Sequence, residues 1–113
     1  MPLTGFPNSN HKAAVDQHSD TVLLGLQSRG KDNPVTARRI TESVGVPGPV
    51  VRAIIHHLRE RGHPIGSNSK GYWYAHSYEE LRPTIMHLEQ RIRSMSSVAG
   101  ALRRSFGGRH VTK

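Results

Sequence analysis

The chain has 113 residues, with 16 Lys and Arg against 8 Asp and Glu and a formal net charge of +8 at pH 7. This length suffices for one domain with a modest core and leaves no room for a deep substrate cleft. The chain has no cysteine, which excludes disulfides, thiolate catalysis and cysteine-rich zinc sites. The cationic surplus favours a polyanionic partner.

The sequence predicts neither a membrane-spanning segment nor a signal peptide. No apolar run approaches the ~20 residues needed to span a bilayer, and the first 20 residues lack an apolar segment with a basic flank. We therefore expect a protein without membrane contact, either in the cytoplasm of a bacterial host cell and associated with the nucleoid, or in a nucleus.

The N-terminal residues 1–17 are rich in Pro, Gly, Asn and Ser and show no sustained hydrophobic period, which predicts a flexible arm. A compact domain is expected over 18–76. Its first helix is predicted to be capped by Ser19 and to end at Gly30. The apolar face of this helix consists of Val22, Leu23 and Leu26.

Two shorter helices follow around a tight turn. Thr36 is a favourable N-cap for a helix over 37–44, and Gly45 suits the left-handed conformation at its end. A third helix is predicted over 49–61, because Pro49 is tolerated in a first turn. The positions expected to be buried recur at spacings of four and three, and they are Ile40, Val44, Val51, Ile55 and Leu58.

Residues 64–75 contain two β-prone runs around a Gly/Ser/Asn turn, which predicts a β-hairpin. Val35 is predicted to add a short strand residue before the second helix. Alternation along the second run favours a buried Trp73, or a buried tyrosine pair. The alternative is that these aromatic rings stack unpaired bases.

A long helix is predicted over 77–106, followed by a basic tail at 107–113. Ser77 and Glu80 form a capping box for it. Its apolar residues keep one coiled-coil register, which indicates a partner helix and therefore a homodimer. The alternative is that its first half packs on the domain and the rest frays. Flanking charges leave the parallel or antiparallel orientation open. The seam consists of Leu81, Ile85, Leu88, Ile92, Met95, Ala99, Leu102 and Phe106.

The segments Thr36–Val46 and Val50–Ile65 combine a helix pair, the turn glycine Gly45 and the sequence Arg-Gly-His-Pro-Ile that leads into the hairpin. This pattern resembles the winged helix-turn-helix DNA-binding family, in the variant found in the N-terminal domain of biotin repressors. The resemblance covers 19–75, and the added C-terminal helix is similar to small bacteriophage-encoded regulators. The implied fold class is mainly α with a small β-hairpin wing, a winged helix-turn-helix followed by a long C-terminal helix.

The resemblance implies that the recognition helix, 49–61, enters the major groove and that the wing, 64–75, lies on backbone or minor groove. Arg52 is the expected bidentate partner of guanine. The implied base-reading residues are Arg52, His56, Val50 and Gly48. The implied backbone and wing contacts are Arg38, Arg39, Thr36, Arg59, Ser67, Asn68, Ser69 and Lys70.

Two features depart from the family pattern. The recognition helix begins with Pro47-Gly48-Pro49 instead of a Ser or Thr cap, and its reading face includes the apolar residues Val50, Ala53 and Ile54. The predicted function is nonetheless double-stranded DNA binding, as a transcriptional regulator or a phage or plasmid replication or maintenance factor. The alternatives are a protein-docking adaptor that uses Val50, Ile54 and the C-terminal helix, and a single-stranded nucleic-acid binder.

Catalysis and metal binding find little support in the sequence. His56 and His57 are adjacent and cannot share one helix face, and His63 and His76 flank the hairpin without a third ligand at matching spacing. No Ser/His/Asp order, phosphate loop or paired carboxylates stands out. We expect no enzymatic activity, no metal, no cofactor and no small-molecule substrate.

Overall fold

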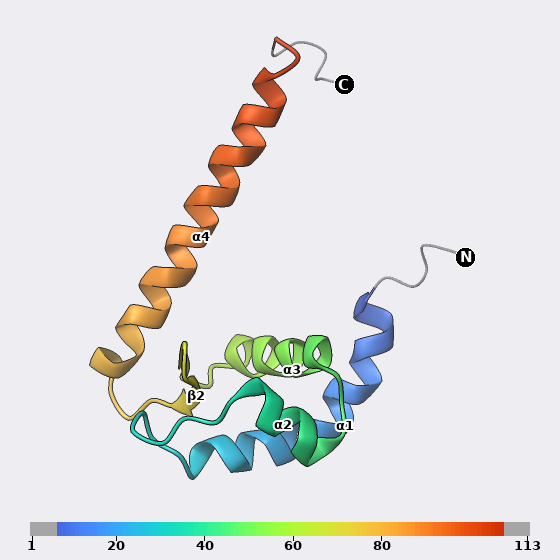
Figure 1. The fold of residues 1–113 in the computed structure, drawn as a ribbon, viewed down its shortest axis with the longest axis vertical. Helices are drawn as coiled ribbons and strands as arrows, with labels where there is room; N and C mark the ends of the chain where they lie inside the picture. The colour runs from blue at the N-terminus through green and yellow to red at the C-terminus, as the bar shows by residue number, and fades with distance from the viewer. Residues whose placement is uncertain (1–6, 108–113) are drawn as a thin grey trace. The chain divides into compact units, whose positions relative to one another are not determined.

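The computed structural model describes the backbone of residues 7–107 and the side chains of residues 11–107. Over this range the protein is mainly helical, with one two-stranded antiparallel sheet and a long C-terminal helix (Figure 1). Residues up to Leu81 form one compact unit and those from Arg82 onward form another. The elements in chain order are α1 (Pro7–Gln27), α2 (Ala37–Val44), α3 (Gly48–Glu60), β1 (Ile65–Asn68), β2 (Gly71–Tyr74) and α4 (Tyr78–Arg104).

Helix α1 begins much earlier than the sequence predicts. The predicted flexible arm over 1–17 was wrong for residues 7–17, which are helical; residues 1–6 lie outside the described range. Burial of Val15, which is 7% exposed, holds this extension against the core. Ser19 is buried inside the helix rather than capping it, and its hydroxyl donates to the carbonyl of Val15 at 2.5 Å. Such back-bonding often bends helices, and α1 changes direction part-way along (Figure 1).

Helix α2 has the predicted bounds and the predicted caps. Thr36 Oγ1 accepts a hydrogen bond from the backbone N–H of Arg39 at 3.0 Å. Gly45 adopts a φ of 72°, and its N–H donates to the carbonyl of Thr41 at 2.8 Å. This left-handed residue ends α2 and, with the two residues after it, redirects the chain into α3.

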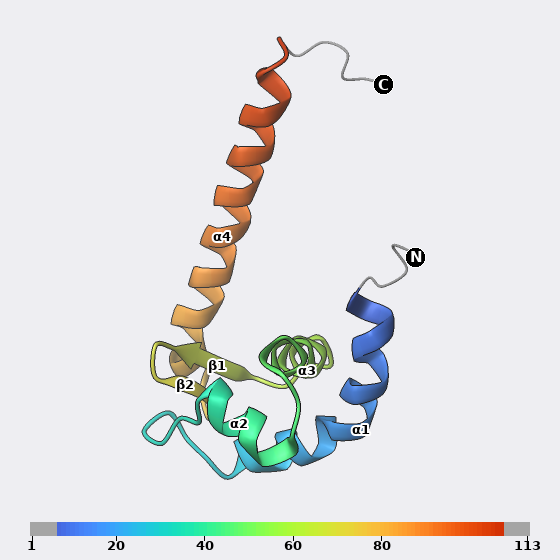
Figure 2. The same cartoon turned by 45° about the vertical axis from the view of Figure 1, so that its right-hand side comes forward.

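Helix α3 lies at the centre of the core. Helices α1 and α2 and strand β1 all pack against it (Figure 2). The sequence predicts Val51, Ile55 and Leu58 on its buried face, and all three are buried. Val50 and Ile54 are buried as well, so the apolar stripe is wider than predicted. A helix covered on more than one side needs this wider stripe.

Strands β1 and β2 pair in the register Ile65↔Tyr74 and Gly66↔Trp73, which confirms the predicted hairpin. Trp73 is 2% exposed, so its predicted place in the core is confirmed. Val35 forms the predicted short strand residue: its N–H and carbonyl exchange two 2.8 Å hydrogen bonds with Tyr72. The hairpin is thereby joined to the loop before α2.

Helix α4 starts at a capping box. The N–H of Glu80 donates to Ser77 Oγ at 3.2 Å, and the Glu80 carboxylate accepts from the N–H of His76 at 2.8 Å. The helix ends at Arg104, two residues before the predicted end. No helix in the described part of the chain has the length and apolarity to cross a bilayer.

Gly66 offers a test of hairpin packing. A Cβ at this position would lie 2.6 Å from two ring atoms of Trp73, which is buried and has no room to move. We expect Gly66→Ala to lower the free energy of unfolding by about 1–3 kcal/mol, measured by denaturant titration. Gly25→Ala in α1 is the control, because open space surrounds Gly25; it should leave stability unchanged or raise it by up to ~1 kcal/mol. Equal stabilities of the two variants would contradict this packing.

Candidate nucleic-acid interface

The solvent face of α3 carries two of the predicted base-reading side chains. Arg52 is exposed, and its Nη1 lies so close to the first turn that a Cβ on Gly48 would be 3.8 Å away. The side chain of His56 is 73% exposed, one turn further along the helix. Its Nε2 lies 3.1 Å from Glu60 Oε2. These groups project from a helix whose opposite face is anchored in the core.

Val50 was wrongly predicted as a base reader. It is 6% exposed and belongs to the hydrophobic core, together with the fully buried Ile54. Both side chains face the elements that pack on α3, because the helix buries a wider stripe than a strict spacing of four and three indicates. The apolar residues Val50 and Ile54 of the predicted reading face are therefore buried in the core, and the exposed residues of that face are the polar Arg52 and His56.

Arg59 points toward the hairpin instead of outward. Its Nε donates to the carbonyl of Ile65 at 2.9 Å, and its Nη2 donates to Ser67 Oγ at 3.2 Å. Desolvation lowers the pKa of Arg59, against an opposing electrostatic contribution from Tyr72. In the free chain Arg59 therefore has a structural role, in which it links α3 to β1.

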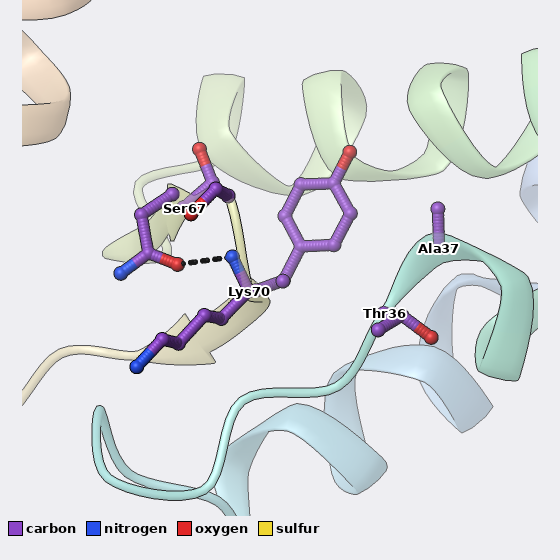
Figure 3. A pocket seen from close by; sticks show the side chains of 8 residues that line it. Thr36, Ala37, Ser67 and Lys70 are labelled. Carbon is purple, nitrogen blue, oxygen red and sulfur yellow. Dashed lines mark hydrogen bonds between the residues drawn. The ribbon is translucent and has the colours of Figure 1, made fainter.

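The hairpin turn and the start of α2 enclose one open pocket of about 320 Å³ (Figure 3). Thr36 and Ala37 approach it from α2, while Ser67 and Lys70 approach it from the hairpin (Figure 3). The pocket thus brings together five predicted backbone and wing residues from two distant segments. Ala37, Gly71 and Tyr72 were not predicted. The pocket is lined by Thr36, Ala37, Ser67, Asn68, Ser69, Lys70, Gly71 and Tyr72.

A side-chain hydrogen bond in the hairpin turn and close backbone packing hold this pocket in shape. Asn68 Oδ1 accepts from the N–H of Lys70 at 2.8 Å, which fixes the hairpin turn. Gly71 has a φ of 136° and packs so closely that a Cβ would collide with the backbone of Val35. The Val35–Tyr72 pairing is therefore the reason that the hairpin turn lies beside Thr36. The predicted strand character of Val35 was the one feature of the sequence that indicated that the hairpin lies close to the start of α2.

Helices α2 and α3 and the hairpin turn each carry exposed cations. Arg38 Nε lies 3.6 Å from Glu42 Oε2, in a pair whose two side chains are both well exposed. Such exposed pairs contribute little to stability and dissociate readily. Within the described residues, Arg39, Arg52 and Lys70 form no salt bridge. Their charges are available to an anionic ligand.

The histidines do not gather into a metal site within the described residues, where no group of three potential ligands occurs. A ring nitrogen of His63 lies 3.2 Å from the hydroxyl of Tyr74, within the hairpin region.

Comparisons with protein-family models, with curated proteins and with solved structures found no match for this chain. Functional interpretation therefore depends on the chemistry of the surface itself.

Replacing Arg59 should loosen the hairpin. Arg59→Met keeps the aliphatic stem but removes the donors to Ile65 and Ser67, and we expect a loss of about 1–3 kcal/mol in unfolding free energy. Amide hydrogen exchange should accelerate in β1 and β2 more than in α2. The control is Arg61→Met, which removes the same charge from an exposed position. Unchanged exchange in the hairpin of Arg59→Met would refute the positioning role.

Proposed function

We propose that this chain binds double-stranded DNA as a winged helix-turn-helix protein, with α3 as the recognition helix and the β1–β2 hairpin as the wing. The observation that carries the proposal is the outer face of α3. Five buried side chains pack one side of the helix against the core, and Arg52 and His56 are exposed on the other side. A cationic, uncovered helix face is what a major groove accepts.

Base reading falls to Arg52 in this proposal. Its guanidinium lies beside Gly48, at the N-terminal turn of α3, the part of a recognition helix that contacts base edges. Glycine at this position carries no side chain, so the backbone of the first turn can approach a groove closely. Bidentate donation to O6 and N7 of guanine discriminates by about 1–3 kcal/mol. His56 supplies a second polar contact one turn along, once its pairing with Glu60 is exchanged.

Backbone contacts fall to the other two elements. Arg38 and Arg39 lie in the first turn of α2, and Lys70 lies at the tip of the hairpin. The pocket between these elements is lined by Ser69 and Lys70 on the hairpin side and by Thr36 and Ala37 at the start of α2. Cations on two elements that flank a helix are suited to phosphates on either side of a groove.

Each alternative function loses some of its residues, but the C-terminal helix stays exposed and Tyr72 and Tyr74 are only half-buried. A protein-docking surface on α3 required exposed Val50 and Ile54, which are 6% and 0% exposed. Single-strand binding by stacking required an accessible Trp73, which is 2% exposed. Duplex binding relies on residues that are exposed, and we therefore favour it, in the role of a transcriptional regulator or of a replication or maintenance factor in the cytoplasm.

Duplex binding is tested by fluorescence anisotropy with a site selected from a random duplex pool. The intact chain should prefer this duplex to single strands of the same sequence. Its affinity should fall steeply with salt, because phosphate contacts release counterions. Tighter binding to the single strand, or an affinity that ignores salt, would contradict the proposal.

Two substitutions separate base reading from backbone contact. Arg52→Ala should lower the preference for the selected site over random duplex about tenfold, since it removes a base contact. Lys70→Ala should weaken all duplexes alike and reduce the slope of log affinity against log salt by about 0.9. Arg93→Ala removes one exposed cation from α4 and serves as the charge-matched control for both. An Arg52→Ala variant that keeps full site preference would exclude this residue as the base reader.

A further inference from the structure

Helix α4 exposes an apolar stripe along the part that belongs to the C-terminal unit. Ile92, Met95 and Leu102 are each 66% exposed, and Phe106, just beyond the end of the helix, is 78% exposed. Leu88 and Val98, at 38% and 59%, extend the same stripe. Scattered surface apolar residues need no explanation, but these recur every three or four positions on one side of one helix.

The size of this stripe matches half of a protein interface. Side chains of this size at this exposure contribute on the order of 100 Å² each, so the six together present on the order of 600 Å². This area lies at the upper end of the largest apolar patch on a typical monomer, about 300–600 Å². Two such stripes facing each other bury on the order of 1,200 Å², the lower bound of a specific interface. A second copy of the helix is therefore a sufficient occupant.

The identity of the apolar residues indicates how many helices associate. In heptad terms Ile85, Ile92 and Ala99 occupy position a, while Leu88, Met95 and Leu102 occupy position d. β-Branched residues at a with leucine at d favour two strands in parallel over trimers and tetramers. The two isoleucines occur at a and the two leucines at d, and the remaining two positions carry Ala99 and Met95, which fit either state.

The residues that flank the stripe form no code of opposite charges, but the like charges that meet differ between the two orientations. In a parallel pair each g residue faces the e residue of the partner's next heptad, which matches Thr84 with the partner's Glu89 and Arg91 with the partner's Ser96. No like charges meet. An antiparallel pair centred on the stripe instead brings Arg103 near the partner's Arg82 at both ends. Like-charge juxtaposition disfavours that arrangement.

We propose that residues 85–106 pair with the same residues of a second copy as a parallel two-stranded coiled coil. The proposal does not depend on nucleic-acid binding, because it concerns only the free chain. A helix with an uncovered apolar stripe gains little stability by itself in water, and packing against a partner supplies what propensity does not. The pairing also gives each assembly two copies of α3.

Oligomeric state is measured on the full chain without DNA, by sedimentation equilibrium. The molar mass should be twice that of one chain. Ile92→Glu should return it to one chain mass, because it puts a charge in the stripe. Ile92 is 66% exposed in the single chain, so this change leaves the core around α3 intact. Gln90→Glu adds the same charge at position f, outside the stripe, and should leave the mass doubled.

Orientation is measured by disulfide trapping, which the chain permits because it has no cysteine of its own. Leu102→Cys should give a covalent dimer on oxidation, since equivalent d positions adjoin in a parallel pair. In an antiparallel pair Leu102 adjoins the partner's Ile85, and the two introduced thiols lie about 25 Å apart along the axis. Ser97→Cys, at the outward position f, should stay unlinked and is the matched control.

Four results would overturn the proposal. They are a single-chain mass for the unmodified protein, a trimeric or tetrameric mass, a doubled mass that survives Ile92→Glu, and a dimer in which Leu102→Cys links no better than Ser97→Cys. Circular dichroism of each variant shows whether the helices are retained. A dimer that forms without any affinity for duplex DNA would leave this proposal standing and remove the proposed function alone.

Discussion

Burial of the wide apolar face of α3 is the interaction on which the rest of the N-terminal unit depends. Five of its thirteen residues are buried, and α1, α2 and β1 all pack against this helix. Because those side chains fix the rotation of the helix, they also decide which residues face outward. Arg52 and His56 are exposed for this reason, and a different rotation would replace them with the isoleucines and valines of the core.

The stability and the position of the β1–β2 hairpin depend on the elements that pack against it. A two-stranded sheet by itself is marginally stable in water. Here Arg59 attaches β1 to α3, Trp73 fills the space beside Gly66, and Tyr72 pairs with Val35 in the loop before α2. These attachments give the turn at Ser69 and Lys70 a fixed position beside α2. The hairpin turn and the start of α2 thereby line one pocket.

The C-terminal unit differs from the N-terminal unit in that most of its apolar residues are exposed. Its helix carries a regular apolar stripe whose members from Ile92 onward are largely exposed. Intrachain packing explains the first unit, and the proposed pairing between copies would bury the stripe of the second. Polar residues flank the stripe, and their charges bear on orientation more than on affinity.

Local signals in the sequence determined α2, the turn after it, the hairpin and the start of α4. Thr36 and Ser77 cap helices, Gly45 adopts a left-handed conformation and Trp73 alternates into the core, and each acts within a few residues of itself. Only the tertiary structure decided what depends on a distant neighbour. The helical turns before Ser19 are stabilised because Val15 packs in the hydrophobic core, although the composition of these turns resembles that of a loop. Val50 is buried and Arg59 turns inward because of elements far away in the chain, and no local period encodes contacts of that kind.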